Sequence, residues 1–249
     1  MRWLTPCRGG ENTWVFDRSA RWYDAFYAHV DYQAEAQEVT AIIHALKPDA
    51  GSLLDVACGT GRHLAWFRLQ FECAGTDVEP EMLAIARETL PGVPLEKADM
   101  VELDLGRKFD AVTCLFSSIG YTARPERLDR AVRMMAGHLH PGGVLVVEPW
   151  ITPEAWIGNG TVTVDVVEDS VGKLVRIISS RRERDETLLR MHYVQAAGGE
   201  IATEDERHRL GLFSRGRYLD AFTSAGLSAT WHDPGLRGRG LLVGQAGPA

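Results

Sequence analysis

Two glycines and three carboxylates carry the most informative chemistry in this chain. Gly59 and Gly61 follow a short apolar run and precede a helical pattern, and glycines in that position let the backbone approach a small ligand closely. Asp55, Asp77 and Asp99 recur at intervals of 22 residues. This spacing is expected when successive strand and helix units each deliver one carboxylate to the same edge of a parallel sheet. The sequence therefore predicts a ligand site made of one glycine loop and three acids.

The glycine loop separates two classes of ligand. A dinucleotide-binding loop has a third glycine three residues after the second, which lets helix and strand pack around a pyrophosphate, but this chain has Leu64 there. A ligand with amine and hydroxyl groups and no phosphate suits the carboxylates better, and S-adenosylmethionine is such a molecule. Asp55 is the candidate for its amino end, and Asp77 for both ribose hydroxyls. Asp99 is the candidate for the adenine amino group, with Met100 covering the ring.

Six sequence blocks resemble a known enzyme family over nearly the whole chain from Tyr23 onward. They are YDAFY at 23–27, SLLDVACGTG at 52–61, LGRKFDAV at 105–112, FSSIGY at 116–121, PGGV at 141–144 with VEPW at 147–150, and GRGL at 238–241. The chain resembles the class I S-adenosylmethionine-dependent methyltransferases. Within them it is most similar to the N-methyltransferases that finish nucleotide-linked deoxyaminosugars for macrolide and related antibiotics. The glycine loop identifies only the superfamily, whereas the blocks at 116–121, at 148–150 and around Arg239 indicate the subfamily.

The resemblance implies roles for individual residues. Tyr121 matches the family position where an aromatic or histidine side chain lies near the reacting amine, so it is the candidate catalytic residue. The alternative is that Tyr121 only packs at the end of a strand. Further cofactor contacts are implied for Tyr27, Tyr32, Ala57 and Leu115, beside the glycines and acids already named. Substrate contacts are implied for Tyr23, Ser117, Glu148, Trp150, Arg181 and Arg239.

Arginines are the candidate ligands for a nucleotide diphosphate, because a guanidinium binds phosphate oxygens through two hydrogen bonds. Arg239 is the first candidate, since Gly238 and Gly240 leave room beside it. Arg181 and Arg182 are further candidates, and a solvated hairpin tip is the alternative for them. The histidines at 63, 138, 140 and 208 have no partner that the sequence reveals, so we assign them no chemistry. The four cysteines lack metal-ligand spacing, so we expect neither a metal nor a disulfide.

Alternating strands and helices must position these residues. The patterns predict strands at 52–57, 72–77, 94–96, 109–115, 143–149, 228–232 and 240–244, and helices at 60–69, 80–90, 125–139 and 215–225. After Trp150 the pattern changes to period two, with strand-like runs near 161–166, 173–180, 187–196 and 203–212. The expected fold is an α/β, Rossmann-like class I methyltransferase domain: a mostly parallel seven-stranded sheet with an antiparallel β insertion covering the cleft. We expect a single domain over 1–249, with an arm or lid at 1–35, a core at 36–150 and 213–249, and the substrate-side insertion at 151–212.

Composition adds few limits. The chain has 249 residues, which is enough to bury a sizeable core. Its net charge of −7 gives no reason to expect a nucleic-acid partner. No apolar stretch reaches the roughly 18 residues of a membrane span, and the N-terminus lacks the apolar core of a signal peptide. We therefore expect a cytoplasmic protein without a membrane partner.

Taken together, the residues and the resemblance predict an S-adenosylmethionine-dependent N-methyltransferase. It would place one or two methyl groups on the amino group of a dTDP-linked deoxyaminosugar and release S-adenosylhomocysteine. One alternative is methylation of an amine or hydroxyl on another small metabolite or natural-product scaffold. Another is a protein that binds S-adenosylmethionine or its product without turnover, against which Tyr121 and Arg239 argue. The resemblance also allows a homodimer, since many relatives are dimers.

Overall fold

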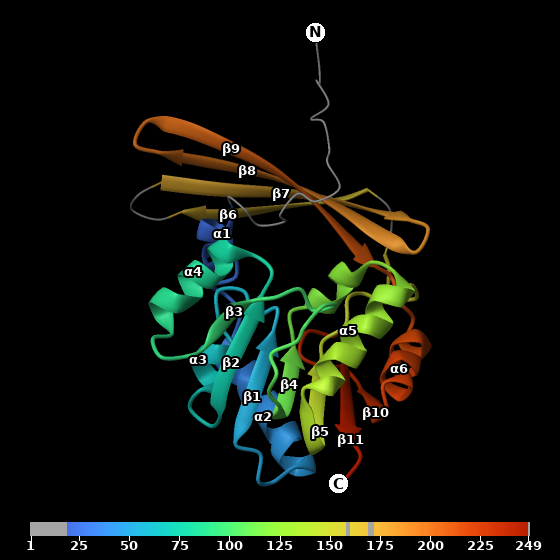
Figure 1. The fold of residues 1–249 in the computed structure, drawn as a ribbon. Coiled ribbons are helices and arrows are strands. Elements are labelled where there is room, and N and C mark those ends of the chain that lie inside the picture. The colour runs from blue at the N-terminus through green and yellow to red at the C-terminus, as the bar shows by residue number, and fades with distance from the viewer. Residues whose placement is uncertain (1–18, 158–159, 169–171, 249) are drawn as a thin grey trace.

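A computed structural model describes residues 19–157, 160–168 and 172–248 of the chain. Within these ranges a central sheet has seven strands in the order β10-β11-β5-β4-β1-β2-β3 (Figure 1). Strands β1 to β5 run parallel, and β11 is antiparallel to both of its neighbours. The strands are β1 (Ser52–Val56), β2 (Glu72–Asp77), β3 (Leu95–Lys97), β4 (Phe109–Cys114), β5 (Leu139–Val147), β10 (Leu227–His232) and β11 (Leu241–Ala246). This arrangement confirms the expected seven-stranded, mostly parallel sheet.

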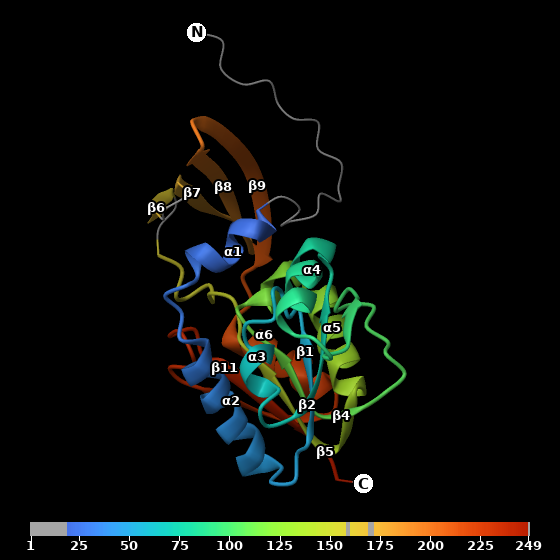
Figure 2. The same cartoon turned by 90° about the vertical axis from the view of Figure 1, so that its left-hand side faces the viewer.

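Helices cover both faces of this sheet (Figures 1 and 2). Apolar side chains of α5 (Pro125–Gly137) and α6 (Arg215–Ser224) pack against one face. Those of α2 (Tyr32–Leu46) and α3 (Leu64–Phe67) pack against the other. The remaining helices are α1 (Ala20–Phe26), α4 (Pro80–Thr89) and the short 3-10 helix η1 (Ser118–Thr122). None of the helices in the described ranges has the length and apolar character needed to cross a bilayer.

A second, antiparallel sheet lies across the end of the first at which the parallel strands finish (Figures 1 and 2). Its order is β6-β7-β8-β9, with β6 (Thr161–Glu168), β7 (Gly172–Glu183), β8 (Glu186–Ala197) and β9 (Glu200–Gly211). Its inner side packs against α1, and β9 also contacts η1. The predicted antiparallel insertion is therefore present and closes over the edge where the three acids were expected.

The helices predicted at 60–69 and 125–139 and the strand predicted at 143–149 have clearly different bounds in the structure. The helix expected at 60–69 is reduced to α3, because Gly59 and Gly61 adopt positive φ values of 56° and 79° and keep the preceding residues in a loop. The helix expected at 125–139 ends at Gly137, and β5 begins at Leu139, which pairs with Phe109 of β4. The expected arm at 1–35 falls partly outside the described residues, since residues 1–18 are not among them.

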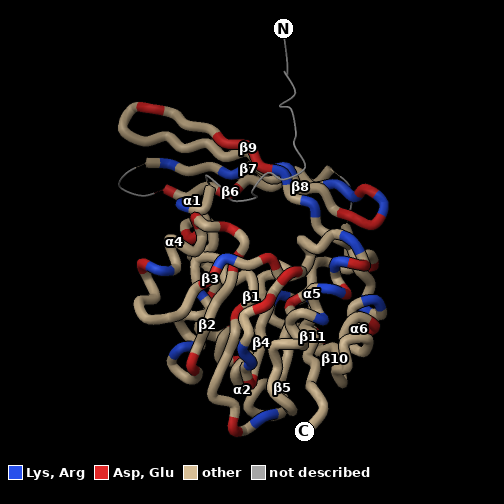
Figure 3. The backbone as a smooth tube through the Cα atoms, viewed as in Figure 1, with Lys and Arg blue, Asp and Glu red and all other residues tan. Residues whose placement is uncertain are grey.

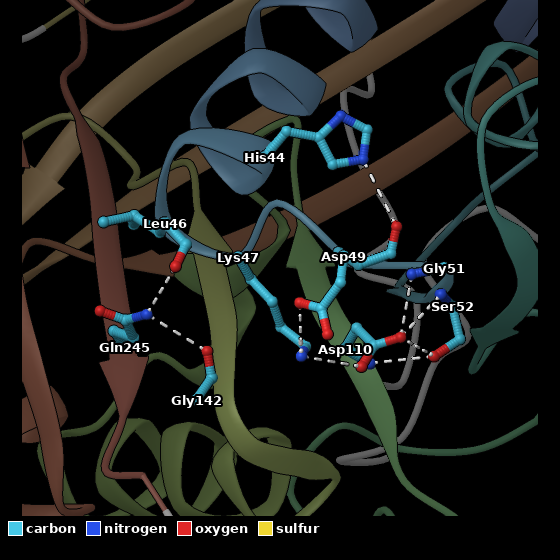
Figure 4. Close-up of polar contacts among 10 residues, drawn as sticks. His44, Leu46, Lys47, Asp49, Gly51, Ser52, Asp110, Gly142 and Gln245 are labelled. Atoms are coloured by element: carbon cyan, nitrogen blue, oxygen red, sulfur yellow. Dashed lines mark hydrogen bonds and ion pairs between the residues drawn. The ribbon is translucent and has the colours of Figure 1, made fainter.

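Asp110 fastens the start of β1 to β4 at the opposite end of the sheet (Figure 4). Its Oδ2 accepts hydrogen bonds from the backbone nitrogens of Gly51 and Ser52, each at 3.0 Å, and from Ser52 Oγ at 2.9 Å. Lys47 Nζ lies 3.5 Å from the other oxygen. Partial burial works to raise the pKa of the Asp110 carboxyl. The hydrogen bonds from Gly51 and Ser52 and the charge of Lys47 outweigh burial and hold the pKa below its usual value.

Asp110→Ala should lower the free energy of unfolding by about 1–3 kcal/mol at neutral pH, because it leaves these backbone donors without their charged acceptor. A lowered carboxyl pKa in the folded state stabilises the protein above the unfolded-state pKa of about 3.9 and loses this effect as the pH falls through the folded-state value. The difference from wild type should therefore shrink below about pH 4. Urea unfolding measures it, with exposed Asp220→Ala as a control that stays within about 0.5 kcal/mol. An equal loss in both variants would contradict this role.

Candidate functional site

The glycine loop between β1 and α3 forms the floor of the site. A side-chain carbon at Gly61 would lie 2.4 Å from Leu90 Cδ1, so this glycine lets the loop pack on the end of α4. A carbon at Gly59 would meet no atom within 4 Å, so the space beside it is open. Ala57 has a positive φ of 58° in the same loop. The loop therefore combines one tightly packed glycine with one that faces free space.

Asp55 is the most deeply placed acid at this edge. It is the penultimate residue of β1 and has 2% of its surface exposed, and one carboxylate oxygen accepts a hydrogen bond from Thr113 Oγ1 at 2.7 Å. Burial raises the pKa of the Asp55 carboxyl to about 6, although the nearby His63 and the bond from Thr113 oppose the rise and Asp77 adds to it. A cationic amino group placed beside this carboxylate would offset the cost of burying it.

The other two acids follow in chain order: Asp77 is the last residue of β2, and Asp99 lies just after β3. Asp77 accepts hydrogen bonds from the backbone nitrogens of Gly59 at 2.8 Å and Glu79 at 2.9 Å. Burial nevertheless raises the pKa of Asp77. A carboxylate has about four acceptor positions, so both oxygens can still accept a hydroxyl each. Asp99 accepts from Val101 N at 3.0 Å and lies 3.3 Å from Arg127 Nη2.

One cleft of about 1350 Å³ unites the acids with the residues expected at the substrate side. This exceeds the roughly 300–1,000 Å³ typical of a single small-molecule site, so two molecules have room side by side. The predicted site residues on its wall are Tyr23, Tyr32, Asp55, Ala57, Gly59, Asp77, Asp99, Met100, Leu115, Tyr121 and Arg181. Gly61, Tyr27, Ser117, Glu148, Trp150 and Arg239 lie outside that wall, and several of them support it.

The residues present fit S-adenosylmethionine. Tyr32 Oη is buried in the cleft wall and has no hydrogen-bond partner among the described residues, so it is available to a polar ligand atom. Asp55 suits an ammonium group, and the free acceptor positions of Asp77 suit a pair of hydroxyls. Met100 and Leu115 supply apolar surface on the same wall for a flat ring. Within the described ranges, no group of histidine, cysteine, aspartate and glutamate side chains is arranged to hold a metal ion.

A buried ion-pair network behind the wall was not predicted from the sequence. Arg237 donates to Glu148 Oε2 at 2.7 Å and to Glu35 Oε2, and its guanidinium lies 4.0 Å from the centre of the Phe116 ring. His63 Nε2 lies 2.8 Å from the same Glu35 oxygen. The network joins α2, the glycine loop, the end of β5 and the loop between β10 and β11. No local pattern marks Arg237, because its partners are 202 and 89 residues away in the sequence.

Arg239 is tied to two of the other predicted substrate residues. Its Nη1 donates to Ser117 Oγ at 2.8 Å, and its guanidinium lies 4.8 Å from the centre of a Trp150 ring. Burial lowers the pKa of the Arg239 guanidinium, and the neighbouring Glu148 opposes the change. Arg181 is more exposed and pairs with Glu183 at the β7–β8 hairpin, where basic and acidic residues lie close together (Figure 3).

Tyr121 and His208 form a pair that the sequence did not reveal. Tyr121 Oη lies 2.7 Å from His208 Nδ1, and His208 Nε2 lies 3.3 Å from Glu206 Oε2. From the sequence, His208 was assigned no chemistry. It lies in β9, but it is fully buried and has partners on both ring nitrogens. His63 and His138 also have partners, namely Glu35 and the backbone of Leu105 and Met134.

Comparison with known proteins matches one family model, and two relatives and one solved structure are closely similar to the chain. Residues 53–143 match the family model described as a methyltransferase domain. A dTDP-3-amino-3,4,6-trideoxy-alpha-D-glucopyranose N,N-dimethyltransferase from Streptomyces venezuelae is 42% identical over 89% of this chain and 95% of that protein. A dTDP-3-amino-3,6-dideoxy-alpha-D-glucopyranose N,N-dimethyltransferase from Streptomyces fradiae is 43% identical over 87% and 86%. The solved structure of S-adenosylmethionine-bound CalS10, an amino pentose methyltransferase from Micromonospora echinaspora, has a TM-score of 0.82 at 37% identity, covering 95% of this chain and 99% of that one.

Asp77→Ala should weaken S-adenosylmethionine binding by about 1–3 kcal/mol, because two hydrogen bonds to the ribose are lost. Isothermal titration calorimetry of the purified protein measures the change. Asp220→Ala, which removes an exposed carboxylate of α6, serves as the matched control and should bind as the wild type does. If Asp77→Ala bound S-adenosylmethionine with unchanged affinity, the assignment of Asp77 to the ribose hydroxyls would be contradicted.

Proposed function

The chain belongs to the S-adenosylmethionine-dependent methyltransferases, in the group of deoxyaminosugar N,N-dimethyltransferases, and from that premise we propose that it methylates the amino group of a dTDP-linked deoxyaminosugar. The proposal depends above all on one observation: a single cleft is lined both by the three acids and by Tyr23, Tyr121 and Arg181. The relatives that support it are named for 3-amino sugars linked to dTDP.

The chain's own residues hold the methyl donor. Bound S-adenosylmethionine supplies an electrophilic methyl carbon on a sulfonium. Asp55 accepts hydrogen bonds from its amino end, and Asp77 accepts from the ribose hydroxyls. Asp99 binds the adenine amino group, while Met100 and Leu115 cover the ring. Contacts from Tyr27, Tyr32, Ala57, Gly59 and Gly61 complete this half of the site.

The substrate half holds the amine in line with the methyl group. Tyr121 orients the amine, because this residue lines the cleft and its hydroxyl is held in place by His208. Arg239 and Arg181 bind the diphosphate, with Ser117, Glu148 and Trp150 holding Arg239 in place. Tyr23 closes the cleft from α1, and the four-stranded sheet, which falls in the 151–212 insertion, forms the substrate wall. The parts of the protein are then an arm at 1–35, a core at 36–150 and 213–249, and this insertion.

Incubation with S-adenosylmethionine and a panel of dTDP-linked 3-amino and 4-amino sugars should add one or two methyl masses to at least one sugar, as read by mass spectrometry. No gain across the panel would contradict the proposed substrate.

In the same assay Arg239→Ala should chiefly raise the KM for the sugar nucleotide, because a charged contact to phosphate is lost. The exposed Arg133→Ala of α5 is the matched control, and an Arg239→Ala effect confined to the methyl donor would remove Arg239 from the diphosphate.

We also propose that the protein forms a homodimer through the outer side of the four-stranded sheet. Edge strand β6 presents Val162, Val164 and Val166 there, each 58–60% exposed, and Ile177 of β7 lies beside Val164. A row of exposed apolar side chains on a sheet is typical of a protein–protein contact. Light scattering should give twice the chain mass for the wild type and the single mass for Val164→Arg. A monomeric wild type would contradict the proposal.

A further inference from the structure

A hydrogen-bonded chain of side chains leads from the cleft into the four-stranded sheet. Tyr121 lies on the cleft wall, and its Oη is 2.7 Å from His208 Nδ1. His208 Nε2 is in turn 3.3 Å from Glu206 Oε2. His208 and Glu206 lie two residues apart on β9, so they share one face of that strand. The three groups thus form a continuous path from the substrate half of the cleft.

The His208 imidazole in this path can take up one proton. Glu206 accepts hydrogen bonds from Tyr193 Oη at 3.1 Å and from Ser19 Oγ, so each of its carboxylate oxygens already has a donor. When Tyr121 donates to Nδ1 of His208, the proton of the neutral imidazole is on Nε2, facing Glu206. The cluster then carries one buried negative charge. A proton taken up by the imidazole would convert it into a neutral, hydrogen-bonded ion pair.

A substrate amine that accepts a methyl group needs a nearby group that can take up its proton. An aliphatic amine is largely protonated near neutral pH, and an ammonium nitrogen has no lone pair with which to attack a methyl carbon. Each methyl transfer to nitrogen therefore requires that one proton leave first. Two transfers to the same nitrogen require this twice.

We propose that Tyr121, His208 and Glu206 form a proton relay that removes the proton from the substrate ammonium before each methyl transfer. This inference rests on the proposed aminosugar function. The ammonium N–H bond breaks, and its electron pair stays on nitrogen. The proton binds Tyr121 Oη as the phenol proton moves to His208 Nδ1, so the phenol remains neutral. The imidazolium is paired with the Glu206 carboxylate and later releases one proton to solvent.

The surroundings keep the phenol protonated while the relay works. Burial raises the pKa of the Tyr121 hydroxyl well above its ordinary value, and the neighbouring Tyr27, Glu206, Tyr193 and Asp77 raise it further. These come from α1, β9, β8 and the end of β2. On β7, the guanidinium of Arg176 is paired with Asp165 at 2.8 Å. Changes in rate near neutral pH therefore report the relay and the amine, not ionisation of the phenol.

The test compares wild type with His208→Gln, which can hydrogen-bond but cannot carry the proton. We expect kcat to fall by about 100-fold at about pH 7, with KM changed less than about twofold, and the deficit to shrink toward about pH 9, where the amine loses its proton unaided. Monomethylated sugar should accumulate. Tyr121→Phe should show the same shift, and the double variant should be no slower than either single one, because the residues act as a unit.

His192→Gln is the matched control. His192 lies on β8 and pairs with Asp205 at 2.9 Å, but on the opposite side of the same sheet and partly exposed. It should keep the wild-type rate and pH profile. Thermal unfolding and S-adenosylmethionine affinity check that each variant is folded.

A His208→Gln enzyme with the wild-type kcat profile across this pH range would overturn the relay while leaving the methyltransferase activity in place. A readout without substrate separates the two proposals. Nitrogen NMR of wild-type protein should show the His208 ring protonated on Nε2 with Nδ1 accepting, and Tyr121→Phe should lose this pattern. A proton fixed on Nδ1 would overturn the relay even if no sugar in the panel were methylated.

Discussion

The burial of one carboxylate, Asp55, at the carboxyl end of a parallel strand is the constraint on which the site depends. The side chain is 2% exposed and receives a bond from Thr113 alone among described side chains. Placing a carboxylate there is costly unless a cation joins it, and this cost appears as a pKa raised to about 6. In the proposed complex, the ammonium group of the methyl donor lies beside Asp55 and removes this cost. The structure therefore keeps a carboxylate poised for that part of the ligand.

The remaining architecture shields this charge from bulk solvent. The seven-stranded sheet holds Asp55, Asp77 and the glycine loop at one edge, and the four-stranded sheet with α1 covers them (Figure 2). The bond from Thr60 Oγ1 to Asp24, at 2.7 Å, joins the loop to α1. In a covered site, hydrogen bonds and charges act more strongly than in water, so a few well-placed groups are enough to orient both substrates.

Much of this arrangement could be predicted from local sequence. The bounds of β2 agree with the predicted strand, and the three acids meet in one cleft as their 22-residue spacing indicated, because successive strands of a parallel sheet end at the same edge. The predicted length of α3 was wrong, because a helical pattern of apolar residues does not indicate that Gly59 and Gly61 hold the backbone in a loop. The predicted roles of individual site residues stay predictions.

Contacts between distant elements could not be predicted. His208 meets Tyr121 across 87 residues, and Arg237 meets Glu148 across 89. These pairs form because β9 and the loop between β10 and β11 fold back onto the ends of the parallel strands. No periodicity in the sequence indicates these contacts. A polar residue on a strand is usually a surface residue, so the sequence alone did not distinguish His208. Its complete burial in the structure does.

The pH dependence of S-adenosylmethionine binding tests the central claim most directly. Asp55 is the acceptor for the ammonium of the donor only when it is ionised. The dissociation constant should therefore be flat at higher pH and rise about tenfold per unit as the pH falls below about 6. Asp55→Asn should bind weakly at all these pH values and show no such rise. A wild-type dissociation constant that stays constant from about pH 5 to 8 would contradict the account, because it would mean that the buried carboxylate does not hold the donor.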